Sequence, residues 1–438
     1  MHPGRSRCHS GRVSDDQSPL PTHEAPAPAD PTHAFGLRVR QWLEENATPV
    51  RGGVGEGAAV LDRDVEKALV AEARVTQRAL FDAGLAGLTW PVAYGGQGLD
   101  IDHHRVFWEE AATYDLGSQF FMIAFGTVGP TLMQIGSEAQ KRRFIPAMLR
   151  GEETWCQLFS EPNAGSDVAS LQTRASQDDD GWLINGQKVW TSGAHRANRG
   201  ALLARTDPDQ PKHQGITMFI VNMNDPGVEV RPLRQATGDA PFNEVFFENV
   251  RVTAEDVIGE VNGGWRAATT MLMNERVAIG TMGERRVGGG EFESLRALAT
   301  GNRLNADPVI RQKLVGVYIS ERILGFLAAQ VQAARRAGRE PGAGGSVAKL
   351  SRALLAGRVG AVGAAIAGAH AQAWPADSVG SDRWARAAMS MYVLSIGGGT
   401  NEIQRNILGE RILGLPREPQ VDGNVPFREL VVGTQRAG

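Results

Sequence analysis

A run of glycines lies near the C-terminal end of the chain, in the stretch SIGGGTNEIQRNILGERILGLP of residues 395–416. Its second half has apolar residues at the spacing of one helix face, and Gly414 and Pro416 are typical of the end of a helix. Glycines and a threonine before a helix offer bare backbone N–H groups to an anion or a carbonyl oxygen. No acid or base stands among these glycines, so a reaction here would take its catalytic group from elsewhere.

Two stretches in the middle of the chain could contact a flat ligand. In CQLFSEPNAGSDVASLQTRA, residues 156–175, an apolar run leads into a turn of small residues with hydroxyls at Ser160 and Ser166. Such a turn lets backbone and hydroxyl groups approach a ligand closely, although an ordinary β-turn fits the stretch equally well. In INGQKVWTSGA, Trp190 precedes Thr191 and Ser192. An aromatic plane beside hydroxyl donors suits a stacked heteroaromatic cofactor.

Composition limits the class of protein. The 438 residues are 42% hydrophobic, which is enough for a large core in two or three domains. Lys and Arg number 46 against 49 Asp and Glu, so the net charge of −3 gives no basic excess and we expect no nucleic-acid partner. The two cysteines favour a reducing, cytoplasmic setting. The Ala/Gly-rich run of residues 359–374 is shorter than the ~20 residues of a membrane span, so we expect a buried helix there and no membrane span.

Hydrophobic periodicity divides the chain into four segments. Residues 1–33 are rich in Pro, Ser, His and charge and lack the apolar core of a signal peptide, so we expect a disordered extension. Residues 34–154 have a helical pattern, and residues 155–262 contain β-type runs such as GITMFIVNM, VEVRPL and NEVFFENVRV. Within this β segment, the dipeptide Asn185-Gly186 predicts a type I′ hairpin turn. Residues 263–438 return to helical periodicity, so the predicted class is α+β in the order helical, β, helical.

Five motifs stand in the order in which acyl-CoA dehydrogenases have them: WPVAYGGQG, CQLFSEPNAGSD, INGQKVWTSGA, GW…NER and GGGTNEIQRN…ER.LGLP. The chain resembles this family over residues 35–416. The resemblance implies an N-terminal helical domain, a middle β-barrel and a C-terminal four-helix bundle, in agreement with the order of elements above. It also implies FAD as cofactor, an acyl-CoA thioester as substrate and an electron-transfer flavoprotein as acceptor.

The resemblance also implies which residues surround cofactor and substrate, and no metal site is expected. The residues expected at the flavin are Gln157, Leu158, Phe159, Ser160, Ser166, Trp190, Thr191, Ser192, Thr400 and Glu402. The residues expected at the substrate are Ser166, Arg276 and Gly399. For Arg276, a role as an ion-pair partner in the core is an equally good interpretation.

The resemblance places the catalytic base at Glu275. Many family members carry this Glu immediately before the GT of the glycine turn, where the present chain has Gly398. A minority, similar to isovaleryl- and long-chain-type members, carry it on the first helix of the bundle, and Glu275 in TTMLMNERVAIG stands at the matching position. Its apolar neighbours are expected to raise its pKa, although a solvated Glu beside Arg276 is the alternative. The backbone N–H of Gly398 is expected to donate to the thioester carbonyl oxygen.

Two motifs of typical homotetrameric members are missing. In those proteins an R..F pair and a Q..GG turn from a neighbouring subunit complete the FAD site. The corresponding stretches here, LRALATGNRLNADP and HAQAWPADSVGSDRW, lack the Phe in register and the Gly-Gly pair. The FAD pyrophosphate would lose charge and backbone contacts. Either another part of the chain compensates in a homo-oligomer, or a paralogous subunit completes a heterotetramer, as in the heteromeric acyl-CoA dehydrogenases of bacterial steroid degradation.

The leading functional hypothesis is FAD-dependent α,β-dehydrogenation of an acyl-CoA, or a related acyl thioester, to the trans-2-enoyl thioester. One alternative keeps the fold but makes the protein a flavin oxidase or monooxygenase. Another makes it a non-catalytic structural subunit of a heteromeric dehydrogenase, which Glu275 on an apolar helix face disfavours. The acyl group is not identified by the sequence. Glycines at Gly397 and Gly398 suggest room for a branched or ring-bearing chain, from fatty acid or steroid side-chain metabolism.

Overall fold

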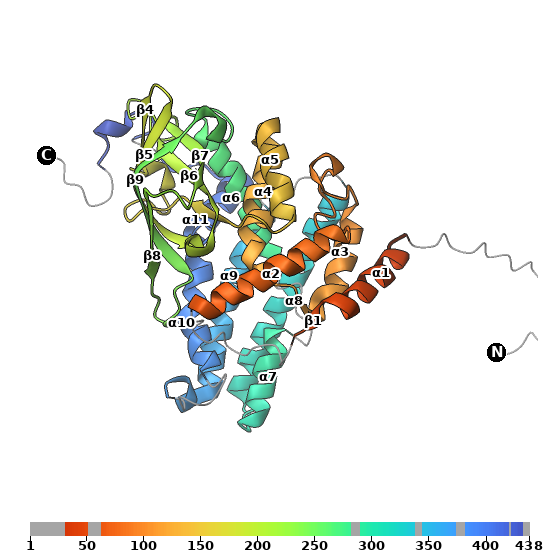
Figure 1. Cartoon of the computed structure of the whole chain (residues 1–438). Helices are drawn as coiled ribbons and strands as arrows, with labels where there is room; N and C mark the ends of the chain where they lie inside the picture. Colours follow the sequence, from red (N-terminus) through yellow and green to blue (C-terminus); the bar gives the residue numbers. More distant parts are fainter. Residues whose placement is uncertain are drawn as a thin grey trace, which may run out of the picture.

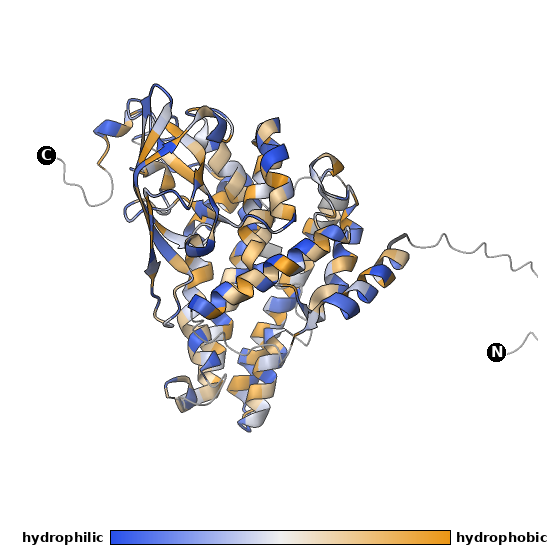
Figure 2. Ribbon diagram, in the orientation of Figure 1, coloured by the Kyte–Doolittle hydropathy of each residue, from blue (hydrophilic) through white to orange (hydrophobic). Residues whose placement is uncertain are grey.

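The computed structural model of the chain describes residues 31–50, 63–281, 290–337, 344–373, 382–419 and 422–431. Residues 1–30, most of the expected disordered extension, lie outside this range, and residues 31–33 form the first turn of helix α1. In Figure 1 strands β4 to β9 lie on one side of the molecule, the N-terminal helices with β1 on the other, and long C-terminal helices extend below and between them. Hydrophobic and hydrophilic residues alternate along most of these elements (Figure 2), as expected for elements that bury one face.

The first region is helical and is tied to the middle region by a helix cap. Ser137 Oγ accepts a hydrogen bond from the N–H of Gln140, and the Gln140 side chain accepts one from the N–H of Ser137, which is a capping box. The Gln140 amide also donates to the carbonyls of Glu255 and Val257 at 2.8 and 2.9 Å. The helices are α1 (Pro31–Asn46), α2 (Arg63–Asp82), α3 (Ile101–Glu110), α4 (Gly129–Ile135) and α5 (Glu138–Leu149). Between them, β1 (Thr48–Pro49) pairs with β2 (Tyr114–Asp115).

The middle region is a curled seven-stranded sheet (Figure 1). Its strands follow the order β3-β6-β4-β5-β9-β8, with β7 paired to β6. β6 is parallel to β3 and β4, and the other pairs are antiparallel. The strands expected from the three β-type runs are confirmed as β7, β8 and β9. The strands are β3 (Trp155–Leu158), β4 (Arg174–Asp178), β5 (Gly181–Ser192), β6 (Arg199–Arg205), β7 (Ile216–Asn222), β8 (Val228–Leu233) and β9 (Phe242–Val252).

The predicted hairpin turn at Asn185-Gly186 is wrong. β5 runs through both residues, and the turn between β4 and β5 lies at Asp179 and Asp180 instead. A β-bulge interrupts the pairing of β5 with β9 at this point. Gly186 has a φ of +153°, and a Cβ on it would lie 2.5 Å from Thr173 Oγ1. The glycine therefore allows a bulge and a close approach of two backbone segments, and it makes no turn.

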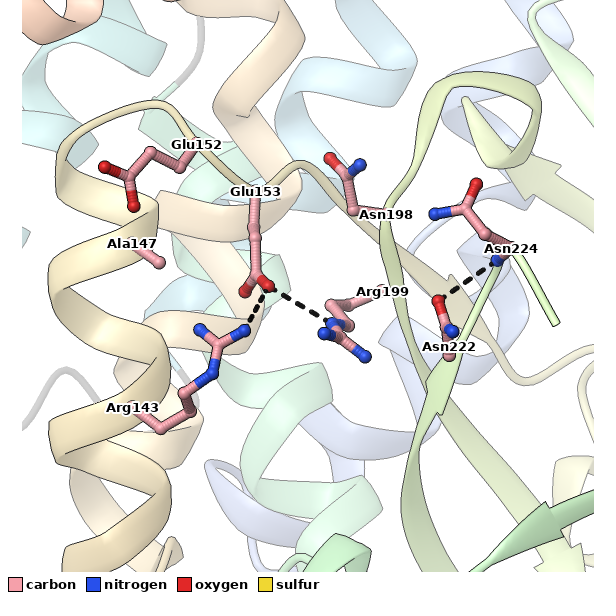
Figure 3. Close-up of a pocket in the computed structure, with 8 residues that line it drawn as sticks. All are labelled: Arg143, Ala147, Glu152, Glu153, Asn198, Arg199, Asn222 and Asn224. Carbon is pink, nitrogen blue, oxygen red and sulfur yellow. Dashed lines mark hydrogen bonds and ion pairs between the residues drawn. The ribbon is translucent and has the colours of Figure 1, made fainter.

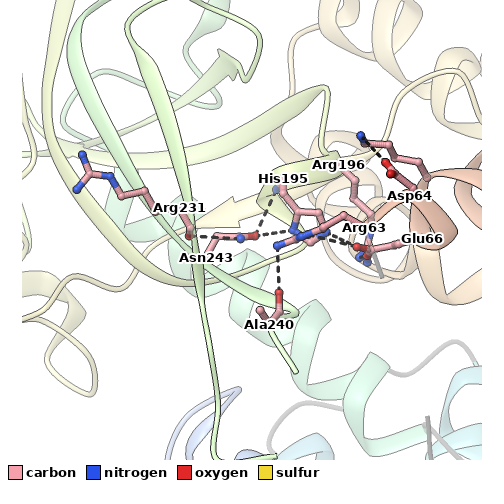
Figure 4. A network of polar contacts seen from close by, with 9 residues as sticks. Arg63, Asp64, Glu66, His195, Arg196, Arg231, Ala240 and Asn243 are labelled. Carbon is pink, nitrogen blue, oxygen red and sulfur yellow. Dashed lines mark hydrogen bonds and ion pairs between the residues drawn. The ribbon is translucent and has the colours of Figure 1, made fainter. Parts of the chain in front are cut away.

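A polar network joins α2 to the sheet beside the end of β5 (Figure 4). Glu66 on α2 accepts a hydrogen bond from Arg196 Nη1 at 2.7 Å and lies 2.8 Å from His195 Nε2. His195 Nδ1 in turn lies 2.8 Å from Asn243 Oδ1 on β9. Burial alone would raise the pKa of Glu66, but His195 and Arg196 outweigh it and hold this pKa below its ordinary value. The network thus fixes the segment that follows Trp190 against the first region.

The third region is a helical bundle around α9. This central helix packs against α6, α7, α8, α10 and α11. Its buried residues are mostly small, which permits close packing: a Cβ on Gly363 would lie 2.1 Å from the ring of Trp384. The bundle helices are α6 (Gly264–Thr281), α7 (Glu291–Gly301), α8 (Pro308–Arg336), α9 (Gly344–Ala367), α10 (Arg383–Ile396) and α11 (Asn401–Arg411).

Within the described part of the chain, two helical segments are long and apolar enough to cross a membrane. They are Pro308–Val331 and Gly344–Ala371, with mean hydropathies of 1.4 and 1.3. Core helices of helical bundles meet the same criteria, and these two segments pack on each other within the bundle. The second contains most of the Ala/Gly-rich run expected to be a buried helix. Length and hydropathy here therefore assign no membrane span.

Candidate active site

α6 carries Glu275 to the junction of the sheet and the bundle. Ala267, Ala268 and Met271, on the preceding turns of α6, are buried in a hydrophobic cluster that also includes residues of the sheet. Glu275 lies one turn further along the helix. Its Oε2 accepts a hydrogen bond from Gln157 Nε2 at 3.2 Å, and Gln157 belongs to β3. The predicted base is therefore held between the first helix of the bundle and the first strand of the sheet.

The glycine turn between α10 and α11 lies on the other side of this carboxylate. Gly398 and Gly399 have φ values of +66° and +88°, which favour glycine. A Cβ on Gly398 would lie 3.6 Å from Glu275 Oε1. Thr400 follows as the N-cap of α11, and its Oγ1 accepts a hydrogen bond from the N–H of Ile403 at 3.2 Å. The carboxylate of Glu275 on α6 thus lies beside residue 398. This is the position at which many family members carry the catalytic Glu and this chain has a glycine.

Burial governs the titration of Glu275. It raises the pKa of the carboxyl, while the hydrogen bond from Gln157 and the charges of Arg276 and Lys349 oppose this rise. A carboxylate with a raised pKa accepts a proton more readily, which suits general base chemistry. Burial also lowers the pKa of Arg276, and Arg411 lowers it further, whereas Glu275 raises it. Arg276 is half-buried next to Glu275 and carries its charge close to the carboxylate.

The wall expected to face the flavin is formed where β3 ends beside β5. The N–H of Val189 donates to the carbonyl of Ser160 at 2.9 Å, and Lys188 Nζ donates to the carbonyl of Phe159 at 3.1 Å. Gln157 Oε1 and Thr191 Oγ1 are buried and have no hydrogen-bond partner within the described residues. Buried polar atoms normally have partners, so these two atoms fit a ligand with its own donors and acceptors, such as an isoalloxazine ring.

Trp190 adds an exposed aromatic plane to this wall. Its side chain is 57% exposed, and its backbone has a φ of +60° within an irregular part of the β5 and β9 pairing. Its ring packs edge-on against Phe242 with 5.9 Å between centroids. Left-handed backbone is unfavourable for a bulky residue, and such strain concentrates at ligand sites. Ser192, half-buried, is two residues further along β5. This geometry fits the expected cofactor contact of Trp190 and Ser192.

Family models match nearly the whole described chain in three consecutive parts. The acyl-CoA dehydrogenase N-terminal domain matches residues 33–152, the middle domain residues 156–250 and the C-terminal domain residues 262–413. The Mycobacterium tuberculosis protein named acyl-CoA dehydrogenase IpdE1 is 38% identical over 388 residues, which are 88% of this chain and 98% of that protein. The chain belongs to the acyl-CoA dehydrogenase family. It is therefore an oxidoreductase with the three-part fold of that family.

Solved structures agree with this membership. A structure named Tcur3481-Tcur3483 steroid ACAD has a TM-score of 0.71 and 29% identity, covering 88% of this chain and 98% of that chain. The ChsE4-ChsE5 complex from Mycobacterium tuberculosis has a TM-score of 0.68 and 29% identity, covering 90% of this chain and all of that chain. Both names describe pairs of differently named subunits. The α+β fold expected from the sequence, with helical first and third regions around a β region, is confirmed.

Other residues expected at the site are placed less directly. The side chain of Leu158 is fully buried in the core of the sheet, so only its backbone can meet a cofactor. Ser166 is exposed on the turn after β3. The carboxylate of Glu402 is 76% exposed and pairs with Arg405 at 3.1 Å. Within the described part of the chain, neither Ser166 nor Glu402 forms a hydrogen bond or ion pair with Glu275.

Two side chains at the glycine turn are absent from the site predicted from the sequence. Lys349 on α9 is 1% exposed, and its Nζ donates to the carbonyl of Gly399. Gln404 on α11 is fully buried, and its Nε2 donates to the carbonyl of Gly398 at 2.9 Å. The only available signal for Lys349 was its place as a single lysine in the largely apolar run SVAKLSRALLAG. A lysine is almost never fully buried without a partner, so a buried lysine in this run implies a partner for its ammonium group.

A buried ion pair was also missed. Lys188 Nζ lies 2.7 Å from Glu161 Oε1, and both side chains are buried. Glu161 also accepts hydrogen bonds from the N–H groups of Gln172 and Thr173 at 2.6 and 2.9 Å. Burial alone would raise the pKa of Glu161, but Lys188 and these hydrogen bonds hold it below its ordinary value. The pair fixes the SEPNAGSD turn against β5, beside the expected flavin wall.

A separate polar cavity of about 310 Å³ lies between α5 and the sheet (Figure 3). Glu153 Oε1 accepts from Arg143 Nη2 at 2.7 Å and from Arg199 Nε at 3.2 Å. The ion pairs connect α5 with β6 and neutralise much of the local charge. The cavity lining contains none of the residues expected at the flavin or the thioester. We therefore assign this cluster a structural role at the junction of the first two regions.

Proposed function

We propose that this chain catalyses the FAD-dependent α,β-dehydrogenation of an acyl-CoA, or a related acyl thioester, to the trans-2-enoyl thioester. One observation carries the proposal: Glu275 Oε1 lies 3.6 Å from the Cβ position of Gly398, beside a turn that presents backbone N–H groups. A base and an electrophilic donor beside each other are what removal of a proton α to a thioester requires. Bound FAD would supply the acceptor for the β-hydride.

The residues of the chain would divide the remaining work. Glu275 would take the α-proton, and the hydrogen bond from Gln157 would hold its second oxygen in place. The N–H of Gly398 would donate to the thioester carbonyl oxygen, which acidifies the α-proton. Gly399, in the same turn, and Arg276, beside Glu275, are the further proposed substrate contacts. Loss of the α-proton to Glu275, with bound FAD as acceptor of the β-hydride, would leave the α,β double bond.

Contacts to FAD form a second part of the proposal. Trp190, Thr191 and Ser192, with the backbone from Gln157 to Ser160, would hold the ring system, and their support is the unpaired polar atoms and exposed aromatic described above. The proposed contacts at the start of α11 and on the SEPNAGSD turn are Thr400, Glu402 and Ser166. Helix N-termini favour anions such as a pyrophosphate.

The central experiment replaces the proposed base. Glu275→Gln should retain fold and flavin but lower turnover by about 10²- to 10⁴-fold, the range for loss of a general base. Glu293→Gln on α7, a partly exposed Glu that pairs with Arg296 on its own helix, is the matched control and should keep wild-type turnover. Wild-type turnover in Glu275→Gln would reject the assignment.

Products separate the alternative chemistries. Enoyl thioester formed without oxygen, with electrons passing to an electron-transfer flavoprotein, supports the dehydrogenase. Hydrogen peroxide or a hydroxylated product would instead identify a flavin oxidase or monooxygenase. A panel of straight-chain, branched and ring-bearing CoA thioesters with an artificial acceptor would define the acyl group. The named steroid ACAD among the solved relatives makes ring-bearing thioesters the first to test.

We also propose a heterotetramer with a paralogous subunit in preference to a homo-oligomer. Two observations support it: the chain lacks the R..F and Q..GG motifs, and two solved relatives are named as pairs of different subunits. The partner would contribute the pyrophosphate contacts, and this chain would contribute Glu275. A cytoplasmic location is proposed from the cysteine content alone.

A further inference from the structure

Lys349 is a buried cation on the central helix of the bundle. It is 1% exposed and is flanked on α9 by small buried residues such as Ala348 and Ala353. Burying a lysine is unfavourable unless its ammonium group has hydrogen-bond partners or an opposite charge nearby. Here Nζ donates to the carbonyl of Gly399, 50 residues away in sequence. The lysine therefore links α9 directly to the glycine turn of the proposed site.

The glycine turn is held by two side chains acting on consecutive carbonyls. Lys349 donates to the carbonyl of Gly399, and Gln404 Nε2 donates to that of Gly398 at 2.9 Å. Because a peptide unit is planar, fixing a carbonyl also fixes the direction of the N–H that follows it. The two clamps thus orient the peptide planes that carry the N–H groups of Gly399 and Thr400, which directly follow the proposed donor, the N–H of Gly398. Preoriented N–H groups are worth more to a developing negative charge than mobile ones.

Lys349 also faces the proposed base. Its Cε lies 3.8 Å from the Cβ position of Gly398, and Glu275 Oε1 lies 3.6 Å from the same point. The charged groups that raise the pKa of Lys349 are the carboxylates of Glu275 and Glu402. Besides Lys349, the charge of Arg276 lowers the pKa of Glu275. The charge of Arg411 in turn lowers the pKa of Arg276.

The charge of Lys349 is available at neutral pH. Burial lowers the pKa of Lys349 to about 8, while Glu275 and Glu402 oppose this shift. The ammonium is thus mostly protonated at pH 7 and favours the ionised form of Glu275, which is the form that can accept a proton.

We propose that Lys349 is a positioning residue for the dehydrogenation: its ammonium group clamps the Gly398–Gly399 turn and keeps Glu275 ionised. The proposal rests on the proposed function in one respect, that Glu275 is the base. Two roles are combined in one side chain, a hydrogen bond to a carbonyl and a charge beside a carboxylate. They can be separated by substitution, because an amide can donate without carrying charge.

The experiment titrates Glu275 directly in the full chain by infrared difference spectroscopy of the protonated carboxyl band, with no substrate added. Glu275→Gln identifies the band. In Lys349→Gln, which keeps a donor but removes the charge, we expect the pKa of Glu275 to rise by about one unit. Lys349→Arg should restore the wild-type titration. Lys313→Met, at an exposed position on α8, is the matched control and should leave the titration unchanged.

A second variant protects the test against misfolding and isolates the clamp. Lys349→Met removes both charge and donor, so it should show the same shift as Lys349→Gln together with faster amide exchange at Gly399 and Thr400. An unchanged Glu275 titration in a folded Lys349→Gln or Lys349→Met protein overturns the proposal. This readout needs no turnover, so an active Glu275→Gln enzyme would reject the proposed base while leaving the effect of Lys349 on that carboxyl measurable.

Discussion

Buried charges at the candidate site are matched one by one. Lys188 pairs with Glu161, Lys349 with a carbonyl of the glycine turn, and Glu275 with the amide of Gln157. Removing the charge of Lys188 or Lys349 leaves its partner buried and uncompensated, which costs more than the interaction itself contributes. Single substitutions of these buried residues are therefore expected to change the free energy of unfolding most.

The ion pair of Lys188 gives the first prediction. Lys188→Met should lower the free energy of unfolding by about 3–5 kcal/mol, because Glu161 stays buried without its cation. Lys67→Met is the control, since Lys67 and Asp64 are 78% and 88% exposed and should change stability by less than about 1 kcal/mol. Urea denaturation at pH 7 measures both. Equal effects would show that burial does not set the strength of the pair.

The pH dependence of the Lys188 variant follows from Glu161. Its pKa is lowered in the folded protein, so the ionised carboxylate stabilises the fold at neutral pH, and this contribution is lost as the pH falls through the folded-state pKa. The difference between wild type and Lys188→Met should therefore shrink in acid. A difference that stays constant down to pH 3 would contradict the lowered pKa.

Glu275 should behave in the opposite way. Its pKa is raised in the folded protein, so its contribution to stability is present below about pH 4.5, the ordinary value, and is lost as the pH rises through the folded-state pKa. Glu275→Gln should therefore be more stable than wild type at pH 7 and show no such gain at pH 4. Thermal unfolding of both proteins across this range is the measurement. A gain of equal size at both pH values would mean that Glu275 is not desolvated.

Sequence alone could supply some of these residues but not others. Glu275 and Gly398 belong to motifs whose order along the chain indicates the protein family. The structure brings these two residues together. Lys349 belongs to a helical stretch whose pattern shows only that it lies among apolar residues. Which turn its ammonium group contacts depends on how α9 packs against α10 and α11. A local sequence pattern carries no information about that packing.

At the scale of elements, the glycine turn depends on its backbone conformation. Gly398 has a φ of +66°, and a Cβ on it would lie 2.7 Å from Ile279 Cδ1. Gly398→Ala should cost about 1–2 kcal/mol of stability from the left-handed backbone and should also lower turnover by displacing the N–H groups. Placing a Glu at this position in Glu275→Gln is expected to fail as a rescue for the same reasons.

A second glycine nearby is the control for the turn. Gly409 lies within α11, and a Cβ on it would lie 3.5 Å from Leu415 Cδ1, an ordinary contact. Gly409→Ala should stabilise the protein by up to about 1 kcal/mol, since alanine favours helix. If Gly398→Ala were as stable and active as Gly409→Ala, the conformation of the turn would not matter for the reaction.

The elements of the middle region show where local patterns suffice. Alternating burial along β8 and β9 matches strands that bury one face, whereas β7 is a largely apolar run that is buried on both faces. Asn185-Gly186 predicts a turn because the same dipeptide favours left-handed backbone in hairpins. In the folded chain, the space beside Thr173 requires the glycine instead, and pairing with β9 continues the strand past it. Contacts between residues distant in sequence therefore decide whether this dipeptide forms a hairpin turn or a β-bulge.

At the scale of the whole molecule, the bundle leaves an apolar surface uncovered. On α8, Val315, Ile319 and Ile323 recur every four residues and are 48%, 50% and 49% exposed. On α10, Tyr392 and Ile396 are 59% and 64% exposed at the same spacing. Contiguous exposed apolar residues at helical spacing are typical of a protein interface. Assembly would bury these faces.

The last prediction concerns what covers them. If each FAD site is completed by a paralogous subunit, the chain purified alone should contain little flavin, because no subunit supplies the missing R..F pair and Gly-Gly turn. Co-expression with a paralogue that carries R..F and Q..GG should raise both solubility and FAD per subunit. Ile323→Glu should abolish this complex by placing a charge in its interface, whereas Gln312→Glu, at an exposed polar position on the same helix, should not. Bound FAD per subunit and mass in solution are the two measurements, and a fully flavinylated, active homotetramer of this chain would reject the heteromer.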